Sequence, residues 1–374
     1  MRSDTADERR IAAAVESIGA IGPLDGNAMT VAAAHLDRLT KPPGSLGRLE
    51  ELVISLAGIT GRPDASVGRR WIVVAAGDHG VASEGVSAYP PEVTAQMVAN
   101  FVTGGAAINI LAAAAGASLA VVDVGVATPI PRTGWLGQDH GRGGRLLRAR
   151  IADGTASMTI GPAMRRTDML RAVAVGLRIV EDLRSDGGVD ILGLGEMGIG
   201  NTTAASATVA ALTGAAVWRV TGTGTGIDED RRAHKIAVIE HALEVNRPDP
   251  GDPLGVLAAV GGLEIAALVG LMLGAAAARI PVVLDGFITA AAALVGATLQ
   301  PALAARLIAS HRSTEPGHAL VLERLGLRPY LDLGMRLGEG SGAALLLGLL
   351  SSACLIRDEM ATFESAAVSG PSDG

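Results

Sequence analysis

Short apolar segments recur along the chain between glycine-rich turns and alanine-rich stretches of helical character. Each has five or six residues with at most one polar residue or proline, which is the pattern of strands buried on both faces of a parallel sheet. The predicted strands are Trp71–Ala76, Leu119–Val124, Val189–Leu194, Ala216–Val220 and Ile280–Leu284. Their spacing leaves room for helical crossovers, so the pattern predicts an α/β fold with a parallel sheet and right-handed connections.

Four longer uncharged runs resemble membrane spans at first sight: Met197–Trp218, Ile265–Ala278, Gly286–Ala305 and Gly340–Ile356. The first and third contain polar residues, and the second and fourth are only 14 and 17 residues long. A spanning helix needs about 20 predominantly apolar residues. We therefore expect buried elements and no membrane span. The first ten residues have no apolar core of the kind that a signal peptide requires, so we expect a cytoplasmic protein.

The composition of the 374 residues excludes several classes of function. The net charge is −7, and the chain has three Trp, two Tyr and three Phe, so it lacks the basic surface and the stacking platforms of a nucleic-acid-binding protein. One cysteine, Cys354, excludes an internal disulfide and a thiolate cluster. The closest histidines are seven residues apart, and no His/Asp/Glu cluster has metal-ligand spacing, so we expect no metal site. The 50 glycines and many small aliphatic residues suit closely packed layers.

Polar residues follow the predicted strands, where ligands bind in open parallel sheets. Asp78 and His79 follow the first strand, Glu196 follows the third, and Asp285 follows the last. Each of these four side chains can orient a substrate. Each can equally form a turn or be a satisfied buried polar group, and the sequence leaves both interpretations open.

The turn from Gly195 to Thr203 matches two nucleotide motifs incompletely. Gly193–Gly198 has the spacing of the dinucleotide fingerprint, but the next predicted strand does not end in the carboxylate that holds a ribose hydroxyl. Gly195 and Gly200 have P-loop spacing, but Asn201 stands where a lysine is needed. Dinucleotide binding and triphosphate hydrolysis are therefore disfavoured. What remains is a glycine turn before a helix N-terminus, which suits one phosphate.

A second glycine turn, Thr221–Gly226, follows another predicted strand and precedes a helix that contains Lys235. Both turns can be tight connections without a ligand, because glycine readily adopts positive φ. Two such turns on successive predicted strands favour a monophosphate or nucleotide site.

Glu339 is the candidate for acid–base chemistry. It lies among three glycines directly before the apolar run Ala343–Leu350, so a flat ligand could approach its carboxylate. The alternative is an ordinary first-turn glutamate that complements the helix dipole. An apolar pocket would raise the pKa of Glu339 and the helix N-terminus would lower it, and the sequence leaves that balance open.

These motifs together resemble the nicotinate-nucleotide:dimethylbenzimidazole phosphoribosyltransferase family. The matching segments are Leu39–Gly47, Ala76–Val81, Tyr89–Thr94, Gly195–Thr203, Leu284–Phe287 and Arg336–Gly342, in the family's order. The resemblance implies a homodimer and a Rossmann-like parallel sheet flanked by helices. We expect a large catalytic domain at 26–340, a small helical domain from 1–25 and 341–361, and a flexible tail at 362–374.

The resemblance also implies a reaction that makes α-ribazole phosphate for the lower ligand of cobalamin. A ring nitrogen of dimethylbenzimidazole attacks the anomeric carbon of nicotinate mononucleotide, nicotinate leaves, and the glycosidic bond changes from β to α. The general base of the family's RLGEGSG motif is Glu339 here. Because nicotinate leaves from a charged pyridinium, we expect no cofactor.

The expected substrate contacts combine this resemblance with the strand-end candidates. The phosphate and ribose are expected at the two glycine turns, and the benzimidazole at the Tyr89–Met97 segment. The expected residues are Asp78, His79, Tyr89, Gln96, Gly195, Glu196, Gly198, Gly200, Asn201, Gly222, Gly224, Lys235 and Asp285. The competing hypotheses are a non-catalytic nucleotide-binding protein, which has no use for Glu339, and another nucleotide-dependent enzyme, which would need the missing lysine or carboxylate.

Overall fold

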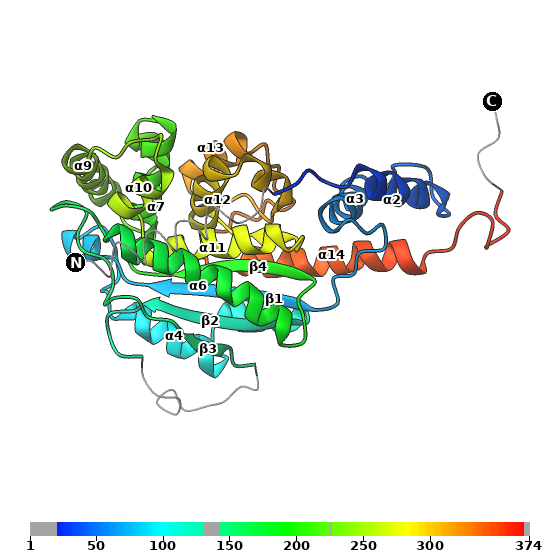
Figure 1. The fold of residues 1–374 in the computed structure, drawn as a ribbon, viewed down its shortest axis with the longest axis horizontal. Helices are drawn as coiled ribbons and strands as arrows, with labels where there is room; N and C mark the ends of the chain where they lie inside the picture. The colour runs from blue at the N-terminus through cyan, green and yellow to red at the C-terminus, as the bar shows by residue number, and fades with distance from the viewer. Residues whose placement is uncertain (1–20, 131–141, 225, 370–374) are drawn as a thin grey trace.

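The computed structural model describes residues 21–130, 142–224 and 226–369. Within them, six strands form one sheet in the order β3-β2-β1-β4-β5-β6, and every neighbouring pair is parallel. Figure 1 shows β3, β2, β1 and β4 side by side in this order. The strands are β1 (Arg70–Gly77), β2 (Ala117–Gly125), β3 (Arg145–Arg148), β4 (Ile191–Met197), β5 (Val282–Leu284) and β6 (Leu307–Ala309). The predicted α/β fold with a parallel sheet flanked by helices is confirmed.

Both faces of the sheet are buried, which explains why its strands are apolar without strict alternation. In β1, Ile72 and Val74 belong to one hydrophobic core, and Val73 and Ala75 belong to the core on the other face. On one face lies α11 (Leu263–Ala277), with α6 (Arg166–Ser185) packed against it. The other face carries α4 (Val93–Thr103), α5 (Ala107–Ala114) and α14 (Ser341–Glu359).

The remaining helices surround these layers. They are α2 (Gly26–Arg38), α3 (Arg48–Thr60), η1 (Gly80–Glu84), α7 (Asn201–Thr213), α8 (Val217–Val220), α9 (Glu229–Asn246), α10 (Pro253–Val260), α12 (Phe287–Leu299), η2 (Pro301–Arg306) and α13 (Pro316–Leu325). Helices α7, α9 and α10 contact one another, and α12 packs against α11, α7 and α13.

Helix α14 crosses the sheet and continues beyond it. Its first residues lie near the carboxyl end of β4, while Ser351 accepts a hydrogen bond from Arg70 at the start of β1 (3.0 Å). Its end joins α2 and α3 in a small lobe at one end of the molecule, where His35 contacts the Arg357 carbonyl oxygen (2.8 Å; Figure 1). Residues 1–20 lie outside the described residues, so the predicted domain boundaries stay a prediction.

The predicted tail begins at Thr362. Thr362 forms an antiparallel bridge with Leu39, and the Phe363 amide donates to the Arg38 carbonyl (3.0 Å). The first residues of this segment therefore lie against α2. Residues 370–374 lie outside the described residues.

One predicted strand is wrong and others differ in extent. Ala216–Val220 is not a strand: Ala216 precedes the helix α8, whose buried Val217 and Val220 are three residues apart while Trp218 is exposed. Strand β4 continues past Leu194 to Met197, because residues 195–197 pair with the end of β1.

The sequence pattern missed two edge strands. Residues 131–150 are polar and rich in glycine and arginine, a composition typical of a loop, but β3 occupies four of them, and 131–141 lie outside the described residues. Three-residue β6 was also missed. Both strands are too short to give a hydrophobic period.

Within the described residues, two segments are long and apolar enough to cross a membrane by length and composition: Val93–Ala114 and Ser341–Glu359. The first comprises α4 and α5 and the turn between them, and the second is α14. In each, half or slightly more of the most apolar window is buried in this fold (50% and 56%). The same segments contribute to the core beneath the sheet.

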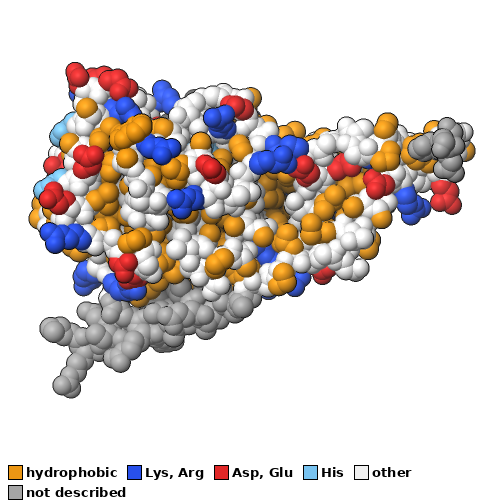
Figure 2. All heavy atoms as spheres, turned by 90° about the horizontal axis from the view of Figure 1, so that it is seen from above, with side chains coloured by type: hydrophobic (Ala, Val, Ile, Leu, Met, Phe, Trp, Pro, Cys, Tyr) orange, Lys and Arg blue, Asp and Glu red, His pale blue; other side chains and the backbone are white. Residues whose placement is uncertain are grey.

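On the face in Figure 2, positive and negative side chains are interspersed.

Candidate active site

The strand order reverses between β1 and β4, and the predicted chemistry lies at the carboxyl ends of the strands around this point. Asp78 and His79 follow β1, Glu196 is the last residue but one of β4, and Asp285 follows β5. The loop that contains Glu339 reaches the same edge from the segment before α14. The topology thus brings together side chains more than 250 residues apart in sequence.

The Glu339 loop has an unusual backbone. Gly338, Glu339 and Gly340 have φ angles of 84°, 63° and 88°, so all three are left-handed. Glycine adopts this conformation without steric cost, whereas a residue with a Cβ loses about 1–2 kcal/mol. The Asp285 carboxylate accepts hydrogen bonds from the Gly340 amide (3.0 Å) and the Gly342 amide (2.7 Å). These bonds hold the loop at the start of α14.

The glycine at position 195 lets this loop lie directly on β4. A Cβ there would be 2.4 Å from the Gly340 nitrogen and 2.5 Å from the Glu339 carbonyl carbon and oxygen. Any side chain at position 195 would therefore displace the backbone that carries Glu339. In this chain, the glycine at position 195 of the fingerprint-like motif allows the Glu339 loop to pack against β4.

The Glu339 side chain is buried and only partly satisfied. It is 6% exposed, and its Oε2 atom has no hydrogen-bond partner among the described residues. Burial raises the pKa of Glu339 above its usual value, and a hydrogen bond from the Ile108 backbone at the start of α5 opposes this rise. A buried carboxylate oxygen without a donor is costly. It can accept a proton or a hydrogen bond from a ligand.

Two neighbouring carboxyl groups are held partly protonated near neutral pH. Burial, followed by the charges of Asp285 and Glu264, raises the pKa of Glu196 to about 8. Burial raises the pKa of Asp285 to about 7 in spite of its backbone hydrogen bonds. Asn201 donates a hydrogen bond to Oε2 of Glu196. The site therefore avoids accumulating the full charge of its carboxylates.

A buried ion pair lies beside this cluster. Nε2 of His79 is 2.7 Å from Oε1 of Glu264, at the start of α11. Burial acts to lower the pKa of His79, but the charge and hydrogen bond of Glu264 outweigh it, so this pKa is raised. Asp78 accepts a hydrogen bond from the Ala127 amide (2.8 Å), and burial raises the pKa of Asp78. His79 and Asp78 therefore both have hydrogen-bond partners within the protein, at the edge of the sheet where the carboxyl ends of the strands lie.

The second glycine turn surrounds a buried lysine. Lys235 is 0% exposed, and its Nζ donates to Oγ1 of Thr202 (2.7 Å). Burial lowers the pKa of Lys235 to about 8, and the charge of Glu315 partly offsets this. Oε1 of Glu315 accepts the Gly224 amide (2.9 Å), and Arg336 donates to the Gly224 carbonyl (3.0 Å). The turn is thus tied both to a carboxylate and to the segment before Glu339.

The two glycine turns lie next to each other. Thr202 is in the first turn of α7, directly after Gly200 and Asn201, and a Cβ on Gly224 would be 2.9 Å from its hydroxyl. Gly222 packs against the other oxygen of Glu315, which has no hydrogen-bond partner within the described parts of the chain. A helix N-terminus, a hydroxyl and an ammonium group converge here, and this combination suits a phosphate.

The segment expected to hold the benzimidazole is more exposed. Tyr89 is 53% exposed, and Gln96 is an exposed residue of α4. Between them, Oγ1 of Thr94 accepts a hydrogen bond from the Ile199 amide (3.1 Å). This bond joins the segment to the loop after β4, next to Gly198 and Gly200.

Sequence reasoning missed three site partners: Glu264, Glu315 and Arg336. Glu264 is the second residue of the otherwise uncharged helix α11 and comes two residues after Gly262, so its surroundings in the sequence resemble those of Glu339 only in part. Glu315 precedes Pro316 at the start of α13, and a capping position alone does not distinguish it. Arg336 belongs to the matched segment, but only the fold shows that it reaches the second glycine turn.

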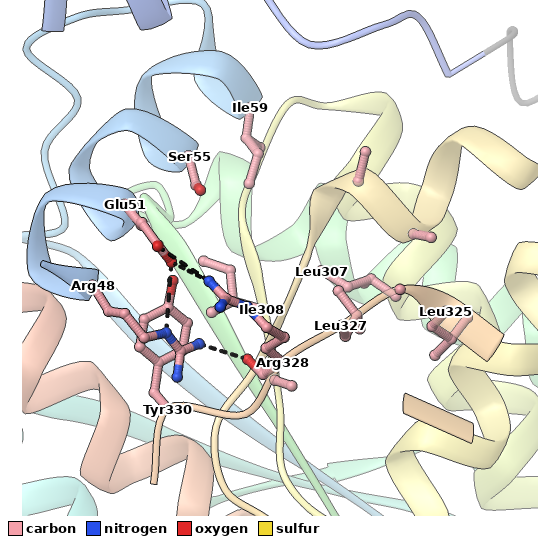
Figure 3. Close-up of a pocket in the computed structure, with 14 residues that line it drawn as sticks. Arg48, Glu51, Ser55, Ile59, Leu307, Ile308, Leu325, Leu327, Arg328 and Tyr330 are labelled. Carbon is pink, nitrogen blue, oxygen red and sulfur yellow. Dashed lines mark hydrogen bonds and ion pairs between the residues drawn. The ribbon is translucent and has the colours of Figure 1, made fainter. Parts of the chain in front are cut away.

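One cavity lies away from this site. It has a volume of about 440 Å³, lies between α3 and β6, and contains none of the predicted site residues (Figure 3). Figure 3 shows Arg48 over the ring of Tyr330, 3.8 Å from its centroid. Among the described residues, no group of three or more His, Cys, Asp or Glu side chains could hold a metal ion.

Similarity to known proteins agrees with the site. A family model described as phosphoribosyltransferase matches residues 21–368. A nicotinate-nucleotide–dimethylbenzimidazole phosphoribosyltransferase from Chloroflexus aggregans is 55% identical over 354 residues, covering 95% of this chain and 97% of the relative. The chain belongs to the nicotinate-nucleotide–dimethylbenzimidazole phosphoribosyltransferase family. A protein of the same name from a Roseiflexus species is also 55% identical, over 95% of this chain and 98% of its own length.

A solved structure of a member of this phosphoribosyltransferase family shares the fold. The enzyme from Thermus thermophilus is 44% identical and superposes with a TM-score of 0.84, covering 93% of this chain and 100% of the other. The family resemblance inferred from the motifs is confirmed. The parallel-sheet fold is therefore that of the phosphoribosyltransferase family. The glycines with fingerprint-like spacing do not indicate that the chain binds a dinucleotide.

Proposed function

We propose that this chain transfers phosphoribose from nicotinate mononucleotide to 5,6-dimethylbenzimidazole, giving α-ribazole 5′-phosphate and nicotinate for the lower ligand of cobalamin. The named relatives support the activity at 55% identity over nearly their whole length. The observation that carries the assignment of the base is that Oε2 of Glu339 is buried and has no hydrogen-bond partner among the described residues. A protein that only bound a nucleotide would need the phosphate turns but no such carboxylate.

The proposed reaction needs one proton transfer and one displacement. A ring nitrogen of dimethylbenzimidazole donates its lone pair to the anomeric carbon, and Glu339 takes the proton from the other ring nitrogen. The bond from the anomeric carbon to the nicotinate nitrogen breaks, and its electron pair neutralises the pyridinium. Attack opposite the leaving group converts the β linkage to α.

The raised pKa of Glu339 suits a general base, because proton transfer is most efficient when the pKa approaches the working pH. We propose that Lys235, Thr202 and the start of α7 bind the phosphate of nicotinate mononucleotide. Their contacts, with Nζ of Lys235 2.7 Å from the Thr202 hydroxyl, support this role. Fixing the phosphate would orient the anomeric carbon relative to Glu339.

We also propose that the chain forms a homodimer and works in the cytoplasm. The family resemblance supports the dimer, and so do exposed apolar side chains on the small lobe: Val31 on α2 and Leu355 on α14 are 47% and 51% exposed. Light scattering of the purified protein measures the subunit number. A monomer at micromolar concentration would contradict the dimer.

The decisive experiment measures nicotinate release from nicotinate mononucleotide, with and without dimethylbenzimidazole. We expect release by the wild type only with the base present. Glu339→Gln should lower kcat by about 10²- to 10⁴-fold with little change in KM, because the amide cannot accept the proton. Exposed Glu323 on α13 provides the control, and Glu323→Gln should keep the wild-type rate.

Two results would contradict this proposal at different levels. No release by the wild type in the presence of dimethylbenzimidazole would refute the activity. Release at the wild-type rate by Glu339→Gln would leave the activity intact and refute the general base.

A further inference from the structure

The Asp285 side chain faces the protein backbone with both of its oxygens. It follows β5 and is 1% exposed. Its Oδ2 accepts the Gly340 amide at 3.0 Å, and its Oδ1 accepts the Gly342 amide at 2.7 Å. Gly340 is the residue directly after Glu339, so one of these bonds holds the peptide that carries the proposed base. This arrangement differs from the substrate contact that the sequence suggested.

The backbone held by Asp285 is in a conformation that the sequence alone does not favour. Glu339 is the one residue with a Cβ in three consecutive left-handed positions. Such a conformation persists when surrounding contacts fix it, and it occurs preferentially at functional sites. On one side, the hydrogen bonds that the Gly340 and Gly342 amides donate to the Asp285 carboxyl group are contacts of this kind.

Strand β4 fixes the same peptide from the other side. The space beside Gly195 is filled by the Glu339–Gly340 peptide, whose atoms would lie 2.4–2.5 Å from a Cβ at that position. The peptide therefore cannot move further toward β4. Its direction is therefore set by β4 on one side and by the carboxylate of Asp285, directly after β5, on the other.

Asp285 is itself held in place by the two residues that follow β6. Oγ of Ser310 donates to the Asp285 carbonyl oxygen (3.1 Å), and Nδ1 of His311 is 3.7 Å from Oδ1 of Asp285. A Cβ on Gly342 would be 2.0 Å from the same His311 nitrogen, so the loop, Asp285 and His311 are in close contact. The carboxylate has little freedom to turn toward a ligand.

We propose that Asp285 is a positioning residue for Glu339, which fixes the Glu339–Gly340 peptide and does not bind the substrate. Its function is to keep the carboxylate of Glu339 in the orientation in which Oε2 has no hydrogen-bond partner among the described residues and can accept a proton from the substrate. The inference rests on the proposed function, because it requires Glu339 to be the general base. It adds a residue to the catalytic apparatus that acts through the backbone.

The test is Asp285→Asn in the full-length protein, assayed by nicotinate release. Asparagine has one acceptor oxygen, so one of the two amides of the loop loses its partner and faces an NH₂ group. We expect kcat to fall about 10²-fold, the effect of a small displacement of a catalytic group, while KM for nicotinate mononucleotide stays within about threefold. A wild-type kcat, or a raised KM at unchanged kcat, would overturn the proposal.

A double-mutant cycle separates positioning from general structural damage. If Asp285 acts through Glu339, adding Asp285→Asn to Glu339→Gln should change kcat by less than about threefold. Equal losses in both backgrounds would overturn the positioning role. A wild-type rate in Glu339→Gln would instead refute the general base, so the two failures are distinguishable.

Two further variants control for folding. Asp25 caps α2 by accepting the Ala28 amide (2.9 Å) outside the site, and Asp25→Asn should leave kcat and KM unchanged. If Asp285→Asn does not fold, Asp285→Glu replaces it in the cycle, because it keeps the charge and displaces the carboxylate by one methylene. Additive losses with Asp285→Glu would overturn the proposal in the same way.

Discussion

At the scale of single residues, the carboxyl groups at the ends of β4 and β5 must coexist in a buried site. The pKa of Glu196 is raised to about 8, mainly by burial and then by the charges of Asp285 and Glu264. Near neutral pH this side chain therefore holds a proton, and it does not add a negative charge beside Glu339. A protonated carboxyl can also donate a hydrogen bond, which an ionised one cannot.

This protonation predicts how stability depends on pH. The folded-state pKa of Glu196, about 8, lies above its ordinary value of 4.5, so the folded state binds the extra proton between these values. The contribution is fully present below pH 4.5 and is lost as the pH rises through 8. Its slope is at most about 1.4 kcal/mol per pH unit. Glu196→Gln removes it, so the variant should become more stable relative to the wild type from pH 5 to pH 8.

Urea unfolding at pH 5, 6.5 and 8 measures this difference. Glu323→Gln, on the exposed face of α13, should show no pH-dependent difference from the wild type. Parallel stability profiles for Glu196→Gln and the wild type would show that Glu196 titrates normally.

At the scale of elements, the hydrophobic pattern predicted four strands of the sheet. It failed for segments that are too short to show a hydrophobic periodicity. Ala216–Val220 has the composition of a buried strand, yet its two buried valines are spaced as on a helix. A five-residue apolar run fits both structures, and packing of Val217 and Val220 decides between them. Strand β3 is polar and at the edge of the sheet, so it carries no apolar signal.

The sequence predicted only those parts of the candidate site that a pattern within one short segment indicates. Glycines around Glu339 and at the two turns are visible in the sequence, and the fold places these segments along one edge of the sheet. The partners of these residues are set by topology instead. Glu315 meets Gly224 across 91 residues, and His79 meets Glu264 across 185. No pattern within one segment indicates such a contact.

The contact between β4 and the Glu339 loop predicts the effect of a single methyl group. Gly195→Ala places a Cβ about 2.4 Å from the Gly340 nitrogen, so the loop or the strand must shift. We expect a loss of about 1–3 kcal/mol in stability, typical of overpacking, and a fall in kcat of at least about tenfold. Thermal unfolding and nicotinate release measure the two effects.

Gly348 in α14 is the matched control for this change. A Cβ there meets no atom of the described residues within 4 Å, and the position is inside a helix. Gly348→Ala should therefore gain about 0.5–1 kcal/mol and keep the wild-type kcat. Wild-type kcat and stability in Gly195→Ala would show that the loop has more room than the structure indicates.

At the scale of the whole molecule, arginine side chains join the small lobe to the edge of the sheet. Arg48 on α3 donates to the carbonyls of Pro329 (2.6 Å) and Arg328 (2.8 Å) and lies over the Tyr330 ring (Figure 3). Arg306, directly before β6, is 1% exposed. The lobe thus meets the sheet through buried or half-buried donors that pair with backbone carbonyls.

Arg306 makes the most buried of these contacts, and it predicts a local change in stability. Its guanidinium donates to the carbonyls of Ile59 at the end of α3 and of Gly22 before α2. Arg306→Met keeps an apolar stem but leaves these acceptors without their donor, so we expect a loss of about 1–3 kcal/mol. Amide hydrogen exchange should accelerate in α2 and α3, while β1 and β4 keep their protection, because the lobe opens without unfolding the sheet.

An exposed arginine of the same lobe serves as the control for Arg306→Met. Arg38 pairs with Glu364 at 3.4 Å, and the two side chains are 63% and 87% exposed. Such surface pairs contribute about 0–1 kcal/mol, so Arg38→Met should leave exchange in α3 unchanged. If Arg306→Met instead accelerated exchange equally in the lobe and the sheet, the two parts would unfold as one unit. The arginine contacts would then be part of a single core and would not be a joint between two parts.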